Sequence, residues 1–222
     1  MRMTREERDR VTAAVTAAEA GTDGEIVTVV ARRSDAYHDV ALHWTLLAML
    51  LVLALLAAFP RAIEWSHALI DPWAPAVSIS AALTMALFVL AITFLICRLL
   101  FAWRPLRLAL TPGETKARRV RARALAIFRA SAEKRTAHGT GVLLYLSLDE
   151  HRAEIIADAA IHDRVPDGVW GAAMAALIGP LHKGRAAEGM VAAVGQIGLV
   201  LAEHFPRTPG DVNELPDRLI IL

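Results

Sequence analysis

The segment Glu25–Ala31, with the sequence EIVTVVA, gives the strongest indication of the fold. Five of its seven residues are β-branched, which favours a β-strand, and its apolar side chains fall on both faces, as in a strand that is covered on both sides. A helix is predicted before it, because Thr4 and Glu7 have the spacing of a capping box and Gly21 is a typical helix terminator. One helix and one strand bury too little apolar surface to fold alone, so this segment must pair with strands further along the chain.

Two long apolar stretches without charged residues follow the strand, from Val40 to Pro60 and from Pro72 to Cys97. Each reaches the roughly 20 residues that a helix needs to cross a hydrocarbon layer about 30 Å thick. They predict transmembrane helices at residues 40–60 and 75–97, joined by a short outer loop at residues 61–74. The alternative is a pair of buried core helices, although such helices seldom run beyond about 14 residues without a charge.

Basic residues predict the orientation of this helical hairpin. The connection between the two stretches holds one basic residue, Arg61, whereas the segment after the second stretch is rich in arginine. By the positive-inside rule, both ends of the hairpin are expected in the cytoplasm, with the hairpin in the cell inner membrane. The basic residues of that segment are Arg98, Arg104, Arg107, Lys116, Arg118, Arg119, Arg121 and Arg123. The run from Lys116 to Arg123, on a predicted helix, also suits contact with anionic lipid headgroups.

Residues 98–205 are expected to supply the rest of a soluble domain. A capping box at Thr111 opens a predicted helix that runs to about Thr136. The segments GVLLYLSL and RAEIIAD then flank a turn at Asp149, and their apolar character predicts a pair of antiparallel strands.

Two further helices and a tail complete the predicted domain. Apolar residues recur at helical spacing in residues 170–181 and 190–201. The tail at residues 206–222 ends in LIIL, which fits either a strand or a segment packed on a helix. Together with residues 1–39, these elements predict an α/β (α+β) sandwich, a three- to four-stranded sheet with flanking helices that the two-helix transmembrane hairpin interrupts. An antiparallel helix pair returns the chain almost to its point of departure, so the insertion acts topologically as a surface loop.

The order of these elements resembles the TPM domain family. That family shows a helix, a strand like EIVTVVA, a helix, a strand like GVLLYLSL, a charged turn before a strand like RAEIIAD, and a helix opened here by PDGVW. The resemblance covers Glu6 to Ala31 and about Val120 to His204, with the hairpin as an insertion. It implies a role beside membrane complexes, since members are known or proposed to act in photosystem II repair and in receptor modulation. Some members bind calcium or have been credited with acid phosphatase activity.

Acidic residues gather where the second strand of the predicted pair ends and the next helix starts. The candidate metal ligands are Asp158, Asp163 and Asp167, with His162 among them, and carboxylates suit a hard cation such as calcium. The carboxyl end of a strand is also a favoured place for a ligand crevice in open α/β sheets. The alternative is that Asp167, which follows Pro166, caps the next helix.

Composition and motifs narrow the classes of function. The chain has 222 residues, is 55% hydrophobic and carries a net charge of +1, which gives no support for a nucleic-acid partner. Its one cysteine excludes an internal disulfide framework. The sequence contains no glycine-rich phosphate loop and no nucleophile elbow, so it identifies no catalytic or cofactor-binding residue.

These observations lead to two hypotheses for the function. The first is an integral membrane protein whose TPM-like domain acts as an interaction or maintenance module for membrane protein complexes, in contact with lipids and with another membrane protein. The alternative is a phosphatase on the same domain that depends on calcium or magnesium.

Overall fold

The computed structural model of the chain divides into two compact units. Unit 1 comprises Met1–Asp35 and Gly113–Leu222, and unit 2 comprises Ala36–Pro112. The residues on either side of the predicted hairpin therefore belong to one unit. The structure describes residues 3–70, 73, 77–131, 139–166, 168–209 and 213–222.

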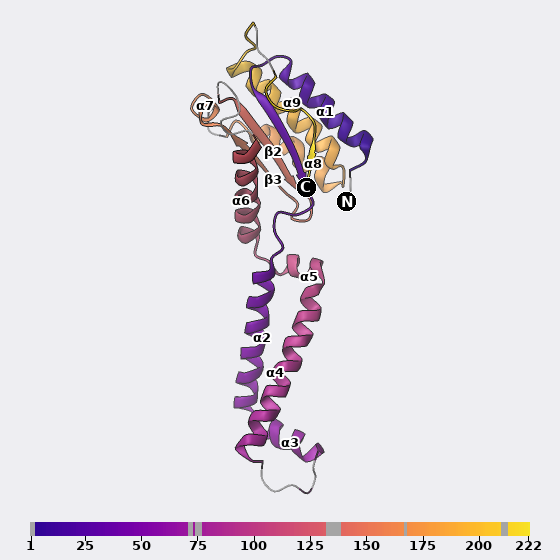
Figure 1. Ribbon diagram of the computed structural model, residues 1–222, viewed down its shortest axis with the longest axis vertical. Helices are drawn as coiled ribbons and strands as arrows, with labels where there is room; N and C mark the ends of the chain where they lie inside the picture. The colour runs from indigo at the N-terminus through magenta and orange to yellow at the C-terminus, as the bar shows by residue number, and fades with distance from the viewer. Residues whose placement is uncertain (1–2, 71–72, 74–76, 132–138, 167, 210–212) are drawn as a thin grey trace. The chain divides into compact units, whose positions relative to one another are not determined.

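Unit 1 contains a four-stranded sheet in the order β3-β2-β1-β4 (Figure 1). β1 pairs in parallel with β2 on one side and with β4 on the other, and β2 pairs antiparallel with β3. The tail run LIIL thus supplies the edge strand, one of the two positions that its sequence allows. The strands are β1 (Glu25–Ala31), β2 (Gly141–Ser147), β3 (Arg152–Ala157) and β4 (Ile220–Ile221).

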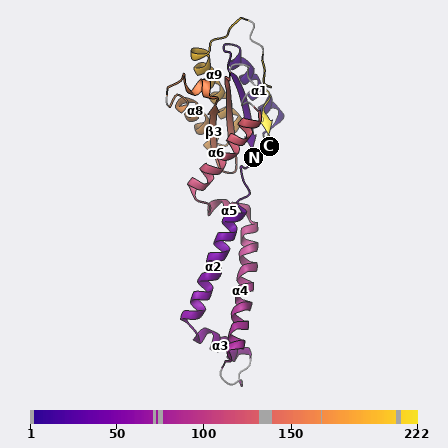
Figure 2. The ribbon, with the colours of Figure 1, turned by 60° about the vertical axis from the view of Figure 1, so that its left-hand side comes forward.

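Helices cover both faces of this sheet, which confirms the predicted α/β sandwich (Figures 1 and 2). Three helices share a core with Ile26 and Val30 of β1 on one face, and a fourth packs on Val27 and Val29 on the other face. Every residue of β1 and β2 is buried, which explains why EIVTVVA carries apolar side chains in both directions. The first group is α1 (Arg5–Glu19), α8 (Gly171–His182) and α9 (Ala186–His204), and the fourth helix is α6 (Gly113–Ser131).

Helices α1 and α9 approach each other closely at Gly198. A Cβ atom at this position would lie 2.7 Å from the Cβ atom of Ala18 and 3.2 Å from its Cα atom. On the same side of the sheet, Val11 and Val15 of α1 are fully buried in the core. The small residue at this contact allows α1 to pack against α9.

Unit 2 is made of helices. The two long helices α2 and α4 lie side by side and run in opposite directions (Figures 1 and 2). The connection between them, expected as a loop, contains a helix, α3, in which Trp65 is 70% exposed. The elements are α2 (His38–Ala58), α3 (Arg61–Ile70), α4 (Ile79–Ala102) and α5 (Arg104–Ala109).

Three helices in the described part of the chain are long and apolar enough to cross a membrane, namely α2, α4 and α9. They differ in how much apolar surface the protein itself covers. Half of the most apolar stretch of α9 is buried, whereas for α2 the share is 11% and for α4 it is 0%. The apolar side of α9 is thus used in the core of unit 1, and the apolar surfaces of α2 and α4 remain exposed.

Candidate functional site

The strand order of unit 1 creates a favoured ligand position at one edge of the sheet. The connection that enters β2 ends with α6 on one face, and the connection that enters β4 runs through α8 and α9 on the other face. Where two connections pass to opposite faces of a sheet, a crevice forms beside the carboxyl ends of the parallel strands. Open α/β sheets bind ligands in this crevice. Here the parallel strands β1, β2 and β4 all end at the same edge.

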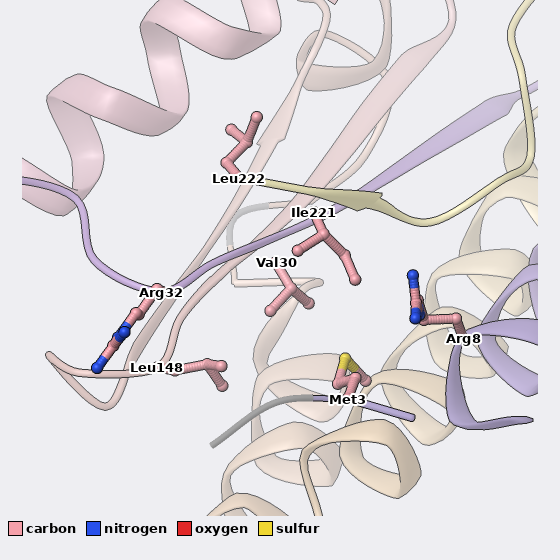
Figure 3. Close-up of a pocket in the computed structure, with 7 residues that line it drawn as sticks. All are labelled: Met3, Arg8, Val30, Arg32, Leu148, Ile221 and Leu222. Carbon is pink, nitrogen blue, oxygen red and sulfur yellow. The ribbon is translucent and has the colours of Figure 1, made fainter. Parts of the chain in front are cut away.

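A pocket of about 320 Å³ lies at this edge (Figure 3). Most of its lining is apolar, and in Figure 3 Val30 and Ile221 lie between Arg32 on one side and Arg8 on the other. None of the residues that line it has a carboxylate side chain. The lining residues are Met3, Arg8, Val30, Arg32, Leu148, Ile221 and Leu222.

The pocket takes its shape from backbone pairing between β1 and its two parallel neighbours. Arg32 N donates to the carbonyl oxygen of Leu222 at 3.1 Å, and Leu222 N donates to that of Val30 at 3.0 Å. On the other side of β1, Leu148 N donates to the carbonyl oxygen of Ala31 at 3.0 Å. These bonds extend the sheet by one residue beyond each strand and fix the apolar side chains that line the pocket.

The two arginines of the pocket differ in their electrostatic surroundings. Arg32 Nε lies 3.8 Å from the Oδ2 atom of Asp149, so its charge is partly compensated. Arg8 Nε donates to the carbonyl oxygen of Thr4 at 3.3 Å, and among the residues that the structure describes Arg8 forms no ion pair. The less compensated positive charge at the pocket is therefore that of Arg8.

A carboxyl pair holds the tail that carries β4. Glu19 Oε1 accepts a hydrogen bond from Ile26 N at 2.7 Å, on strand β1. Asp217, in the tail, accepts from Thr16 Oγ1 at 2.5 Å and from Asn213 Nδ2 at 2.6 Å. These contacts connect α1, β1 and the tail, so they support the position of β4 beside the pocket.

The surroundings of this pair move the two pKa values in opposite directions. Burial, helped by the nearby charges of Glu25 and Asp217, raises the pKa of Glu19 from 4.5 to about 8, although the hydrogen bond from Ile26 opposes the shift. Burial alone would raise the pKa of Asp217, but its hydrogen bonds, led by the one from Thr16, outweigh burial and lower it. The proton of the pair therefore resides on Glu19 at neutral pH.

The predicted metal ligands lie elsewhere in the domain. Asp158 is buried at the N-cap of the short helix α7 (Ala159–His162), and its Oδ2 atom accepts a hydrogen bond from Gly141 N at 3.0 Å. Asp163 is exposed at the end of α7, and Asp167 lies outside the described residues. Within the described part of the chain, no three His, Cys, Asp or Glu side chains form a group that could hold a metal ion.

One expectation about this acidic region needs correction. β3 runs antiparallel to β2, so the carboxyl end of β3 lies beside the amino end of β2, at the edge opposite the pocket. The rule that places ligands at carboxyl ends of parallel strands therefore does not apply to Asp158. The N-cap of α8 is Trp170, and Asp167, for which the sequence suggested a capping role, lies outside the described residues. A calcium site at these three aspartates remains a prediction.

The comparison with known families identifies the domain. Residues 108–200 match the family described as the TPM domain. This part of the chain carries a TPM domain. The family resemblance drawn from the order of its elements is thereby confirmed. No curated protein matches the chain.

A solved structure shares the fold of the TPM domain protein. It is the NMR structure of the BA42 protein from the psychrophilic bacterium Bizionia argentinensis, with a TM-score of 0.57 and 18% sequence identity. The similarity covers 100% of this chain and 97% of the BA42 chain. At this level of identity the similarity establishes the fold alone.

The sequence pattern did not predict the pocket of unit 1. Its lining comes from four separate segments, around Met3, Val30, Leu148 and Leu222, and no local motif connects them. One signal was present, because the apolar run LIIL had to pack against another part of the domain. Its position on β1 became visible only with the sheet order.

Proposed function

We propose that this chain is an integral membrane protein whose TPM domain acts as an interaction or maintenance module for membrane protein complexes. One observation carries the proposal: α2 and α4 have 21 and 24 residues, and each has one buried residue, Thr45 and Cys97 respectively. Both helices satisfy the length and hydrophobicity of a membrane span.

The exposed surface of these helices favours lipid over water. Soluble monomers rarely expose contiguous apolar patches of more than a few hundred Å². Along α2 and α4, large side chains are exposed on most turns, among them Leu46, Leu50, Leu87, Phe88 and Leu95, each more than half exposed. A hydrocarbon layer would cover this surface, and no element among the described residues of unit 2 does so.

Two features support a cytoplasmic position for the TPM domain. The polypeptide on both sides of the hairpin enters unit 1, so both flanks must lie on the same side of a membrane. The positive-inside rule favours the cytoplasmic side of the inner membrane, because basic residues are concentrated after α4. On α6, Arg118 and Arg123 are exposed and suit anionic headgroups, each worth about 1 kcal/mol near such a surface.

The proposal is tested in two steps on the full chain. Carbonate extraction of membranes should leave the protein in the pellet, and its release into the supernatant would contradict membrane integration. Cross-linked affinity purification from the same membranes should then recover a defined membrane protein in fixed ratio. Recovery of the chain alone at every cross-linker concentration would argue against an interaction module.

The phosphatase alternative makes a different prediction. The purified chain would hydrolyse a phosphomonoester in the presence of calcium or magnesium, and Asp163→Asn or Asp167→Asn would abolish turnover. No group of ligands within the described residues favours this alternative. Absence of turnover under both metals would remove it.

A further inference from the structure

We propose that the pocket at the carboxyl edge of the sheet binds a single-chain anionic amphiphile of the fatty-acid class. The carboxylate would be held by Arg8, and the chain would lie on the apolar side chains of Val30, Leu148 and Ile221. This inference concerns a ligand site within the TPM domain and does not depend on the proposed role in membrane complexes.

The size and lining of the pocket limit the class of ligand. Its volume of about 320 Å³ is at the lower end of the range for small-molecule sites, which is about 300–1,000 Å³. Such sites combine a mostly apolar lining with a few polar groups that orient the ligand. Five of the seven lining residues are apolar and the other two are arginines. A single apolar chain with one charged end matches this division, and a lipid with two chains exceeds the space.

Charge complementarity determines the sign of the charge on the ligand. The lining side chains include two guanidinium groups and no carboxylate, and Asp149 partly compensates the guanidinium of Arg32. An apolar surface beside Arg8 lowers the local dielectric constant, so a carboxylate there interacts more strongly with the guanidinium than it would in open water. A neutral chain of the same length would forgo this interaction.

The main alternative occupant is a peptide strand added to the sheet edge. β4 has only two residues, and its register pairs Ile220 with Val29 and Ile221 with Val30. Recognition by strand addition draws its affinity from a row of backbone hydrogen bonds, and so short an edge offers few of them. The observations therefore favour the amphiphile.

The test uses the full chain in nanodiscs of neutral phosphatidylcholine, with a diazirine-bearing decanoate as the photoreactive probe. After photolysis, peptide mass spectrometry should find adducts on peptides that contain Val30, Leu148 and Ile221. Unlabelled decanoate should compete for these adducts, whereas decanol, which has the same chain without the charge, should compete about tenfold less well, the ratio that corresponds to losing one charged hydrogen bond. Adducts on α2 and α4 report partitioning into the bilayer and serve as an internal reference.

Arg8→Gln provides the residue-level test, with Arg10→Gln as the matched control, because Arg10 is an exposed arginine of α1 outside the pocket. Arg8→Gln should reduce the pocket adducts about tenfold relative to the bilayer adducts, and Arg10→Gln should leave them unchanged. Equal competition by decanol and decanoate in the unmodified chain would overturn the proposal even if Arg8→Gln failed to fold. Adducts confined to α2 and α4 would overturn it as well. So would pocket adducts that form only when an added peptide pairs with β4.

Discussion

At the residue scale, the side chain of Glu19 accepts a backbone hydrogen bond from β1 at a point where β4 does not lie beside it. β4 pairs with only the last part of β1, and the carboxylate of Glu19 accepts the hydrogen bond of Ile26 N further back along the strand. Its other oxygen, Oε2, is buried near the carboxylate of Asp217. A buried carboxyl group in this position is more stable when it is protonated, which agrees with its raised pKa.

This leads to a prediction for the pH dependence of stability. The pKa of Glu19 is about 8 in the folded chain and 4.5 when unperturbed, so between these values the folded state binds more protons than the unfolded state. The free energy of unfolding should therefore fall as the pH rises from about 4.5 through about 8, and this contribution should level off above that. Thermal unfolding of unit 1, followed from about pH 5 to pH 9, measures it.

Two variants separate Glu19 from the other carboxyl groups. Glu19→Gln keeps an oxygen for Ile26 N and removes the titration, so much of the pH slope should disappear. Glu203→Gln, at an exposed position of α9, should leave the slope as it is. A Glu19→Gln variant with the slope of the unmodified chain would show that another group causes the pH dependence.

Asp158 and Asp163 differ in a way that stability measurements can resolve. Asp158 is buried and accepts from Gly141 N, so Asp158→Ala should lower the free energy of unfolding by about 1–3 kcal/mol, with or without added calcium. Asp163 is exposed, so Asp163→Ala should change it by less than about 0.5 kcal/mol. A calcium-induced rise in melting temperature that Asp163→Ala abolishes would instead support the predicted metal site.

At the scale of elements, the sequence predicts an element well where local pattern and burial agree. β1 and β2 are apolar on both faces and are buried on both faces, and the turn at Asp149 joins an antiparallel pair, as expected. Two features depended on pairing between segments far apart in the sequence, and the local sequence pattern did not predict them. The segment LIIL could have been a strand or a packed tail, and the pocket exists because that strand joins the far side of β1.

The contact between α1 and α9 allows a matched pair of glycine substitutions. Gly198→Ala places a Cβ atom 2.7 Å from that of Ala18, so it should destabilise unit 1 by about 1–3 kcal/mol through overpacking. Gly195→Ala, on the same helix, meets no atom within 4 Å and should stabilise it by about 0.5–1 kcal/mol, because alanine is the better helix former. Urea unfolding of the two variants measures the difference, and an equal effect of both would contradict the close packing at Gly198.

At the scale of the whole molecule, one domain is formed by two separate parts of the sequence. β1 comes before unit 2 and β2 comes after it, yet the two strands pair along seven residues. Arg119 of α6 forms an ion pair with Asp35, the last residue of the first part, so the two points where unit 2 joins the domain lie close together. The composition of the chain averages two kinds of surface, and the pairing of β1 with β2 shows that unit 2 is inserted within the sequence of unit 1.

Replacing Ala36–Pro112 with a short glycine–serine linker should therefore give a soluble protein with the sheet intact. The removed segment contains α2 and α4 but none of the buried core residues that surround the sheet. Amide hydrogen exchange should show protected β1 and β2 in this variant. A soluble but unprotected sheet would mean that unit 2 contributes to the fold of unit 1.

The most direct test of the central claim, a TPM domain on one side of a membrane with a two-helix hairpin through it, is cysteine accessibility in intact cells. In a Cys97→Ser background, Asp9→Cys, Trp73→Cys and Asp149→Cys are each treated with a membrane-impermeant maleimide. Position 73 should react in intact cells, and positions 9 and 149 should react only after the membrane is permeabilised. Labelling of position 149 from outside, or different behaviour of positions 9 and 149, would contradict the account.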